Sequence, residues 1–184
     1  MGRIEQLADK YRQHVSLPWQ QTVAGAQRVI LVIYDKDLER AILGRKQLFE
    51  LATRETGHEW IEINIADSFA QWMAADEYRD AYFESPDDLQ LKLDSEFAEY
   101  VAARLRDTLE KAEATSVVAV FGVGALFGFT RASRVLKLIE PYIRGRLVVF
   151  FPGVYDQNNY RLLDARDGWN YLAVPITVHS HGGY

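Results

Sequence analysis

Three short runs of apolar and β-branched residues constrain the fold of this chain most strongly. They are residues 28–34 (RVILVIY), 116–121 (SVVAVF) and 146–151 (RLVVFF). A strand of a parallel sheet is covered on both faces, so its sequence is a continuous apolar run and not an alternation. Two more β-rich segments occur at residues 58–65, which alternate, and at 170–178, which contain Pro175 and so indicate a strand that ends there or lies at an edge. The sequence therefore predicts five strands.

Segments with helical periodicity separate most of these strands. Residues 3–15, 37–56 and 131–143 each place apolar side chains on one face, and residues 68–113 predict two helices that break at Ser85-Pro86. Strands alternating with helices predict an α/β fold. We expect a single-domain Rossmann-like architecture: a doubly wound, mostly parallel five-stranded sheet with helices on both faces. We assign residues 1–184 to one domain, with an amphipathic N-terminal helix at 3–15 and a flexible tail at about 179–184.

The composition excludes several classes of protein. The chain has 184 residues, of which 48% are hydrophobic, so one well-filled core is expected. No apolar run approaches the roughly 18 residues of a membrane span, and the charged N-terminal segment lacks the apolar stretch of a secretory signal. With no cysteine there is no disulfide framework or thiol nucleophile, which favours a cytoplasmic location.

Charge is distributed unevenly along the chain. Residues 59–99 contain twelve acidic side chains against two basic ones, and residues 131–147 contain five basic against one acidic. One interpretation is a pair of solvated helix faces; the other is a surface that steers a charged partner. A third, a DNA-contacting subunit that uses Arg131, Arg134 and Arg144, is disfavoured by the net charge of −5.

A glycine-rich segment at residues 122–130 (GVGALFGFT) follows a predicted strand and precedes a helix. Backbone amides and a helix N-terminus hold phosphate in this context. The spacing G-x-G-x-x-x-G is one residue longer than the dinucleotide fingerprint, however, and no Gly-Lys-Ser/Thr follows. We interpret the segment as a structural turn or possible ligand loop, with a partner-facing loop and a nucleotide site as alternatives. Its candidate residues are Gly122, Gly124, Gly128, Thr130 and Arg131.

Two aromatic segments are typical of protein interfaces. Residues 72–88 mix aromatic and acidic side chains, and residues 152–169 form a connection that is long and polar for a compact domain. In the second segment, a salt-bridge cluster of Asp164, Arg166 and Asp167 is an equal alternative to an interface. The candidate partner-binding residues are Tyr78, Tyr82, Phe83, Phe127, Tyr155, Asp156, Asn159 and Tyr160.

Catalytic motifs are not found in the sequence. There is neither a G-x-S-x-G elbow nor an H-E-x-x-H motif, and the pair His179 and His181 lies near the expected tail. Asp35, Asp37 and Asp67 follow predicted strands, where they suit either a magnesium site or ordinary turns and caps. We expect no catalytic residue, no metal and no cofactor.

Several segments together resemble a known family. They are SLPW from Ser16, RVILVIYD from Arg28, YRDAYFESPDDL from Tyr78, GVGALFGFTRAS from Gly122 and RGRLVVFFPGVYDQNNYRLLDARDGWNYLAVPI from Arg144. The chain is similar over almost its whole length to the BrxB family, a component of the BREX bacteriophage-exclusion defence systems of bacteria and archaea.

The resemblance implies a small protein required alongside a DNA methyltransferase, a large ATPase and PglZ, a member of the alkaline-phosphatase superfamily. It implies no catalytic residues and points to association with PglZ, and possible contacts with other BREX subunits, as the physical role. The turn and loop of the family correspond here to structural or interface positions, namely Gly122, Gly124, Phe127, Gly128, Pro152, Gly153 and Tyr155. We therefore expect a non-catalytic adaptor, and the alternative is a degenerate nucleotide-binding domain that uses residues 122–130.

Overall fold

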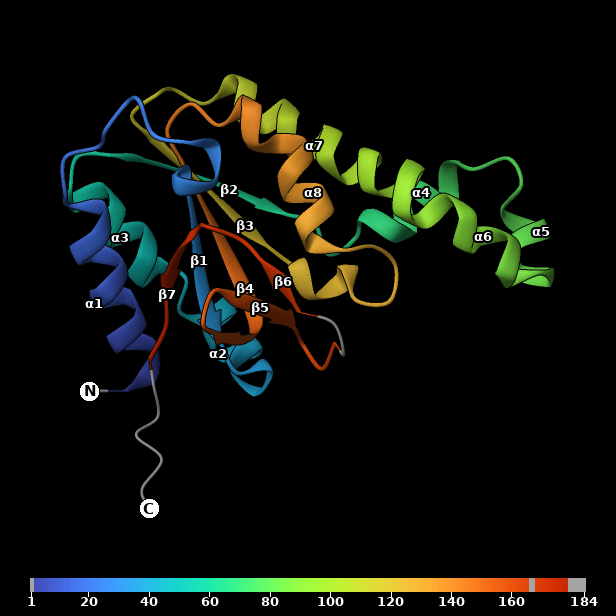
Figure 1. Cartoon of the computed structure of the whole chain (residues 1–184), viewed down its shortest axis with the longest axis horizontal. Helices are drawn as coiled ribbons and strands as arrows, with labels where there is room; N and C mark the ends of the chain where they lie inside the picture. Colours follow the sequence, from blue (N-terminus) through green and yellow to red (C-terminus); the bar gives the residue numbers. More distant parts are fainter. Residues whose placement is uncertain (1, 166–167, 179–184) are drawn as a thin grey trace, which may run out of the picture.

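A mixed seven-stranded sheet forms the centre of the molecule (Figure 1). The computed structural model describes residues 2–165 and 168–178, so the expected tail at 179–184 lies outside the described residues. Five strands pair in parallel in the order β2-β3-β4-β1-β7, and an antiparallel β5-β6 extension pairs with the end of β4. The strands are β1 (Val29–Tyr34), β2 (Glu59–Asn64), β3 (Ser116–Phe121), β4 (Arg146–Asp156), β5 (Asn159–Leu162), β6 (Trp169–Asn170) and β7 (Val174–Ile176).

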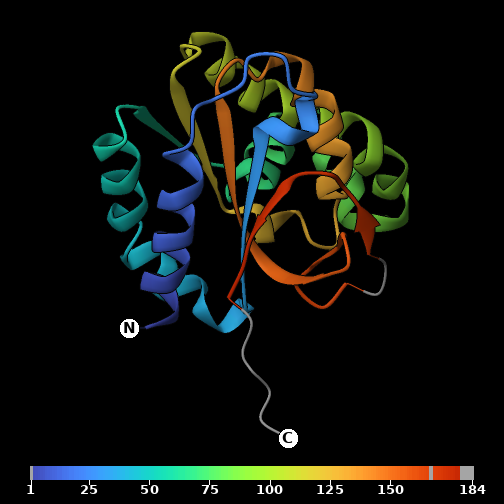
Figure 2. The same cartoon turned by 60° about the vertical axis from the view of Figure 1, so that its left-hand side comes forward.

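Helices cover both faces of the parallel strands (Figure 2). The α-helices are α1 (Arg3–Val15), α2 (Glu39–Gly44), α3 (Gln47–Glu55), α4 (Ser68–Ala75), α5 (Arg79–Glu84), α6 (Pro86–Lys92), α7 (Ala98–Lys111) and α8 (Ala132–Ile139). Short helical turns are η1 (Gly25–Arg28), η2 (Lys36–Leu38), η4 (Val123–Leu126) and η5 (Glu140–Tyr142), and η3 (Leu93–Phe97) is a π-helical turn. The helix expected at 3–15 has those bounds, whereas the one expected at 37–56 is interrupted between α2 and α3.

The two faces of the sheet carry separate hydrophobic cores. Along β1, Val29, Leu31 and Ile33 belong to one core, while Ile30, Val32 and Tyr34 belong to the other. Successive side chains of a strand point to opposite faces, so a strand buried on both faces needs an unbroken apolar run. The first core contains residues of α7 and α8, and the second contains residues of α1 and α3.

A buried hydrogen-bonded pair joins α1 to α3 in the second core. The Tyr11 hydroxyl lies 2.6 Å from Thr53 Oγ1, and the Thr53 hydroxyl also lies 2.8 Å from the Phe49 carbonyl oxygen, to which it donates. Both side chains are fully buried. Each polar atom that packing removes from water here therefore has a partner.

The sheet extends further than five strands because much of the segment expected to be a long connection forms strands, at residues 152–156, 159–162 and 169–170. β4 continues through Pro152 and Gly153 to Asp156, then turns back as β5 and pairs with β6. A Cβ on Gly153 would lie 2.0 Å from the Arg161 carbonyl oxygen, so only glycine permits this close approach of β4 and β5. The Pro-Gly pair that favours a loop in the sequence thus lies where β4 leaves the parallel sheet. Pro175 lies in β7, at the edge of the sheet, as expected.

Helix lengths also bear on the question of membrane insertion. None of the helices within residues 2–165 and 168–178 is both long enough and apolar enough to cross a bilayer.

Candidate functional site

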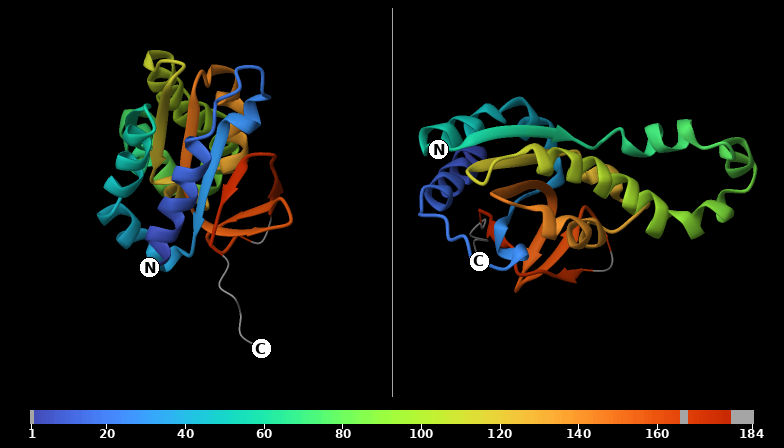
Figure 3. Two further views of the ribbon diagram at one scale, coloured as in Figure 1. Left: turned by 90° about the vertical axis from the view of Figure 1, so that its left-hand side faces the viewer. Right: turned by 90° about the horizontal axis from the view of Figure 1, so that it is seen from above.

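A helical projection extends well beyond the sheet (Figure 3, right). α4 leads outward, α5 and α6 form the far end, and η3 and α7 lead back to the body. We call residues 76–92 the arm. Contacts between aromatic rings fix its position at the base. Phe69 stacks on Phe129 with 4.1 Å between ring centroids, and Trp72 lies 5.2 Å from Phe97 in a tilted arrangement. The base of the arm is therefore continuous with the first hydrophobic core.

The outer surface of the arm exposes apolar side chains. Tyr78 is 64% exposed, Phe83 is 71% exposed and Leu91 is 86% exposed. These side chains lie among six acidic residues, and only Arg79 and Lys92 supply positive charge within the arm. Exposed large apolar groups that cluster on one element mark interaction surfaces more often than scattered ones do.

Tyr82 has a different role from its neighbours in the arm. It is buried, and the Lys92 ammonium lies 5.2 Å from the centroid of its ring. Hydrogen bonding to Tyr82, followed by the charge of Glu96, raises the pKa of Lys92 above its ordinary value. Tyr82 and Lys92 therefore join α5 to α6, and the candidate partner contacts on the arm narrow to Tyr78 and Phe83.

The second aromatic segment forms a hairpin. β4 and β5 are joined at Gln157 and Asn158, which both have positive φ values (46° and 66°), as two-residue hairpin turns require. The Tyr155 hydroxyl donates to Asn158 Oδ1 at 3.1 Å, and its ring lies 4.9 Å from that of Tyr160. Tyr155 therefore makes its side-chain contacts within the hairpin, with Asn158 and Tyr160.

The outer positions of the hairpin differ in exposure. Tyr160 is fully buried and donates a 3.3 Å hydrogen bond to the Ala173 carbonyl oxygen, and burial raises the pKa of its phenol. Asp156 is exposed, and Asn159, which pairs with it across the strands, is half-buried. Tyr160 therefore stabilises the hairpin, while Tyr155, Asp156 and Asn159 remain accessible. The expected Asp164, Arg166 and Asp167 cluster is not described as a whole, since residues 166–167 lie outside the described residues, and Asp164 pairs instead with Lys36.

Two of the three glycines in the turn, Gly122 and Gly128, have positive φ values that favour glycine. Gly122 has a φ of +84°, and a Cβ there would lie 2.4 Å from Asn64 Oδ1 and 2.6 Å from the Ala66 amide nitrogen. A Cβ on Gly124 would lie 3.4 Å from Pro152 Cγ, which is an ordinary van der Waals contact. Gly122 and Gly124 pack the end of β3 against neighbouring segments. They do not form an open cradle for phosphate.

Gly128, Thr130 and Arg131 lie on the other side of this turn, at the start of α8. Gly128 has a φ of +81° and nothing within 4 Å of the position of a Cβ. Thr130 is buried and Arg131 is the N-cap residue of α8. Phe127, a candidate partner contact, is 45% exposed beside them.

The aspartates at the strand ends do not come together. Asp35 Oδ1 accepts a 2.9 Å hydrogen bond from the Asp37 amide, which makes it an ordinary turn residue, and Asp67 pairs with Arg104 at 2.9 Å. Asp35 follows β1 and Asp67 follows β2, and both β3 and β4 lie between these two strands. Three strand spacings, or about 14 Å across the sheet, therefore separate β1 from β2. Within residues 2–165 and 168–178, no group of three or more His, Asp or Glu residues could hold a metal ion.

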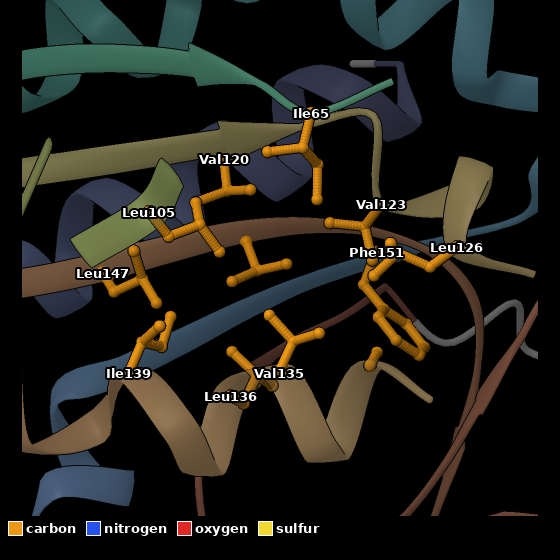
Figure 4. Close-up of a pocket in the computed structure, with 12 residues that line it drawn as sticks. Ile65, Leu105, Val120, Val123, Leu126, Val135, Leu136, Ile139, Leu147 and Phe151 are labelled. Carbon is orange, nitrogen blue, oxygen red and sulfur yellow. The ribbon is translucent and has the colours of Figure 1, made fainter. Parts of the chain in front are cut away.

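A cavity between α8 and the sheet is too small for a ligand (Figure 4). It has a volume of about 20 Å³, and all the side chains that line it are apolar, including Val120, Val135 and Ile139. A dry void of this size is part of the core.

Leu91 is an exposed apolar residue that was not among the predicted contacts. Leu89, Leu91 and Leu93 follow one another at intervals of two residues, and a helix cannot place all three on one face. Leu93 is buried and Leu91 faces solvent. The spacing is therefore a signal for an outward apolar side chain.

A second feature missed in the sequence is a cavity of about 280 Å³ at the carboxyl ends of β1 and β4. Arg3, Asp35 and Tyr155 line it together with Thr177 of the segment after β7. Burial, and then hydrogen bonding to Glu39, raises the pKa of the neighbouring Tyr34. This cavity needs α1, β1 and β4 side by side, so only the folded topology reveals it.

Comparison with known proteins identifies the family. No curated protein and no solved structure shows significant similarity to the chain. A family model described as BREX protein BrxB matches residues 61–176, well over half of the chain. The matched segment contains the arm, the glycine turn and the β4–β5 hairpin, and it ends with β7. The chain therefore belongs to the BrxB family and is a component of a BREX phage-defence system.

Proposed function

We propose that this BrxB protein is a non-catalytic adaptor subunit that works by binding PglZ through its arm. The observation that carries the proposal is the exposure of Tyr78, Phe83 and Leu91 on a helical projection outside the core. Large aromatic side chains on a protruding element are typical anchors of protein interfaces. Burying them against a partner removes apolar surface from water without unfolding the body of the molecule.

The charge of the arm indicates what the partner surface is like. The arm that carries the apolar anchors also carries exposed acidic side chains such as Asp80, Asp87 and Asp88. A complementary surface would combine apolar pockets with Lys or Arg side chains, and such contacts raise the association rate at low salt. We therefore infer that the complex weakens as ionic strength rises.

The fold supports a scaffold role. Parallel strands covered by α1 and α3 on one face and by α7 and α8 on the other agree with a doubly wound, Rossmann-like plan. In this proposal the sheet supplies a rigid body, and the arm supplies the contacts.

Affinity measurements with single-site variants test the proposal. The full chain is mixed with the PglZ encoded beside it, and the dissociation constant is measured at two salt concentrations. Tyr78→Ala and Phe83→Ala should each weaken binding about tenfold or more, because truncating an interface anchor costs at least about 1–2 kcal/mol. The melting temperature should stay within about 2 °C, because exposed substitutions change stability little.

Leu172→Ala is the matched control. Leu172 is 71% exposed, as Phe83 is, but lies outside the arm. It should leave the affinity unchanged. Equal affinities for the wild type and both arm variants would exclude the arm as the interface. No complex under any condition would exclude PglZ as the partner.

A further inference from the structure

A cavity of about 390 Å³ lies between the start of α8 and the segment that carries β5 and β6. Phe127, Thr130, Arg131 and Ser133 line one side of it, and Asp164 and Trp169 line the other. Its volume falls within the usual range for small-molecule sites, about 300–1,000 Å³. It is separate from the arm, so what it binds does not depend on the proposed adaptor function.

The helix start provides hydrogen-bond donors on the cavity side. The Arg131 carbonyl oxygen accepts the first bonds of α8, from Arg134 at 3.1 Å and Val135 at 3.4 Å. The amides of Ala132 and Ser133 precede these bonds, and Arg131 caps neither with its side chain. Both amides have no partner among the residues that the structure describes. Free amides at a helix start favour an anion.

Thr130 gives a second and independent indication of a ligand. The residue is only 6% exposed, and its Oγ1 has no hydrogen-bond partner within residues 2–165 and 168–178. A buried hydroxyl without a hydrogen-bond partner lowers the stability of the folded state, and native structures contain few of them. Its place beside the two free amides suits it to donate to an oxyanion.

Unpaired cations continue from the cavity along α8. Arg131, Arg134 and Lys137 form no ion pair within the described part of the chain, although nine other cation–carboxylate pairs occur there. The carboxylate that lines the cavity, Asp164, is already paired with Lys36. Asp94 is the one carboxylate that shares a surface hollow with Arg131, Arg134 and Lys137 among the described residues, so positive charge exceeds negative charge there, in a protein with a net charge of −5.

Aromatic rings complete the walls of the cavity. Phe127 is 45% exposed, and Trp169 is half-buried on the opposite side. Flat apolar rings of this kind stack nucleobases. We propose that the cavity binds a nucleoside monophosphate, whose phosphate contacts the Ala132 and Ser133 amides, Thr130 Oγ1 and the Arg131 guanidinium while its base lies against Phe127 or Trp169.

Titration calorimetry of the full chain in phosphate-free buffer tests this site with AMP, adenosine and inorganic phosphate as probes. AMP should bind at least tenfold more tightly than inorganic phosphate, and adenosine should bind more weakly than AMP by at least the same factor. Equal affinities for AMP and phosphate would overturn the role of the aromatic walls. No binding of AMP at millimolar concentration would overturn the whole site.

Two variants and a control locate the site. Thr130→Val and Arg131→Gln should each weaken AMP binding about tenfold, since each removes a hydrogen bond to a charged group. Arg144→Gln is the control, because Arg144 is also exposed but lies beyond the opposite end of α8, before β4. It should leave the affinity unchanged. Equal losses for Arg144→Gln and Arg131→Gln would show non-specific attraction by charge and overturn the proposal. None of these results depends on PglZ binding.

Discussion

Replacing Thr130 by valine should stabilise the protein when no anion is bound. Thr130 Oγ1 is buried without a partner in the described chain, so folding removes it from water with no compensating hydrogen bond. Such a hydroxyl costs about 1–3 kcal/mol. Valine has nearly the same shape, so Thr130→Val should raise the free energy of unfolding by about 1 kcal/mol, or the melting temperature by about 2–4 °C.

The same substitution at Thr53 should have the opposite sign. Thr53 Oγ1 bonds the Phe49 carbonyl oxygen at 2.8 Å and the Tyr11 hydroxyl at 2.6 Å. Thr53→Val removes both bonds and leaves the buried Tyr11 hydroxyl without this partner. The expected loss is about 2–3 kcal/mol, from one lost bond and one orphaned group.

Urea denaturation in phosphate-free buffer at neutral pH measures both changes. Thr130→Ser serves as a further control, because it keeps the hydroxyl and removes only the methyl group, and it should destabilise the protein slightly. A loss of 1 kcal/mol or more for Thr130→Val, similar in sign to Thr53→Val, would show that the Thr130 hydroxyl has a partner in the free protein. That outcome would also remove the main support for an anion site at α8.

Two other perturbations have expected outcomes of known direction. Gly122→Ala should lower the free energy of unfolding by more than about 2 kcal/mol, because the new Cβ clashes with its neighbours and the backbone has a positive φ. Gly128→Ala should lower it by about 1 kcal/mol, because φ is positive but the Cβ meets no atom. Equal losses for the two variants in urea denaturation would contradict this reasoning. Burial, and then the charge of Arg146, lowers the pKa of His14 in the folded protein below the ordinary value of 6.5. As the pH falls, His14 is therefore protonated in the unfolded chain before it is protonated in the folded one, and the free energy of unfolding should decrease below pH 6.5. His14→Gln should reduce that loss between pH 7.5 and 5.5, and an unchanged pH profile would show that His14 does not contribute.

Continuous apolar runs located three of the parallel strands, β1, β3 and the first part of β4, whereas β2 was indicated by alternation and β7 (Val174–Ile176) is shorter than the segment 170–178 predicted for it. β1 and β3 are buried at every position, as a strand covered on both faces must be, and the predicted bounds differ from the observed ones by no more than one residue. The two extra strands could not be predicted, because Pro152 and Gly153 interrupt the apolar pattern at the point where β4 leaves the parallel sheet. Local sequence preference favours a loop there, and the pairing with β5 depends on contacts between distant segments.

Exposure of individual aromatic residues was harder to predict than their location in helices. Tyr82 and Phe83 are neighbours of the same type, yet one is buried and the other faces solvent. Neighbouring helical residues point about 100° apart, and a helix of only six residues is too short for the pattern to select the face. Thr130 and Arg131, which line the cavity at the start of α8, were predicted as candidate ligand residues from the glycine-rich segment. Trp169 also lines this cavity, but only because β6 folds next to α8, which the sequence pattern does not show.

The π-helical turn η3 (Leu93–Phe97) gives the arm an unusual sensitivity to insertions and deletions. A π-helical turn is in effect an α-helix with one inserted residue, and one residue corresponds to a rotation of about 100° about the axis. Loss of a single codon in this turn would convert α6 and α7 into one regular helix and redirect Leu91 and the rest of the arm, with no residue changed at the tip. Related proteins could therefore acquire different binding specificities through the length of this turn alone.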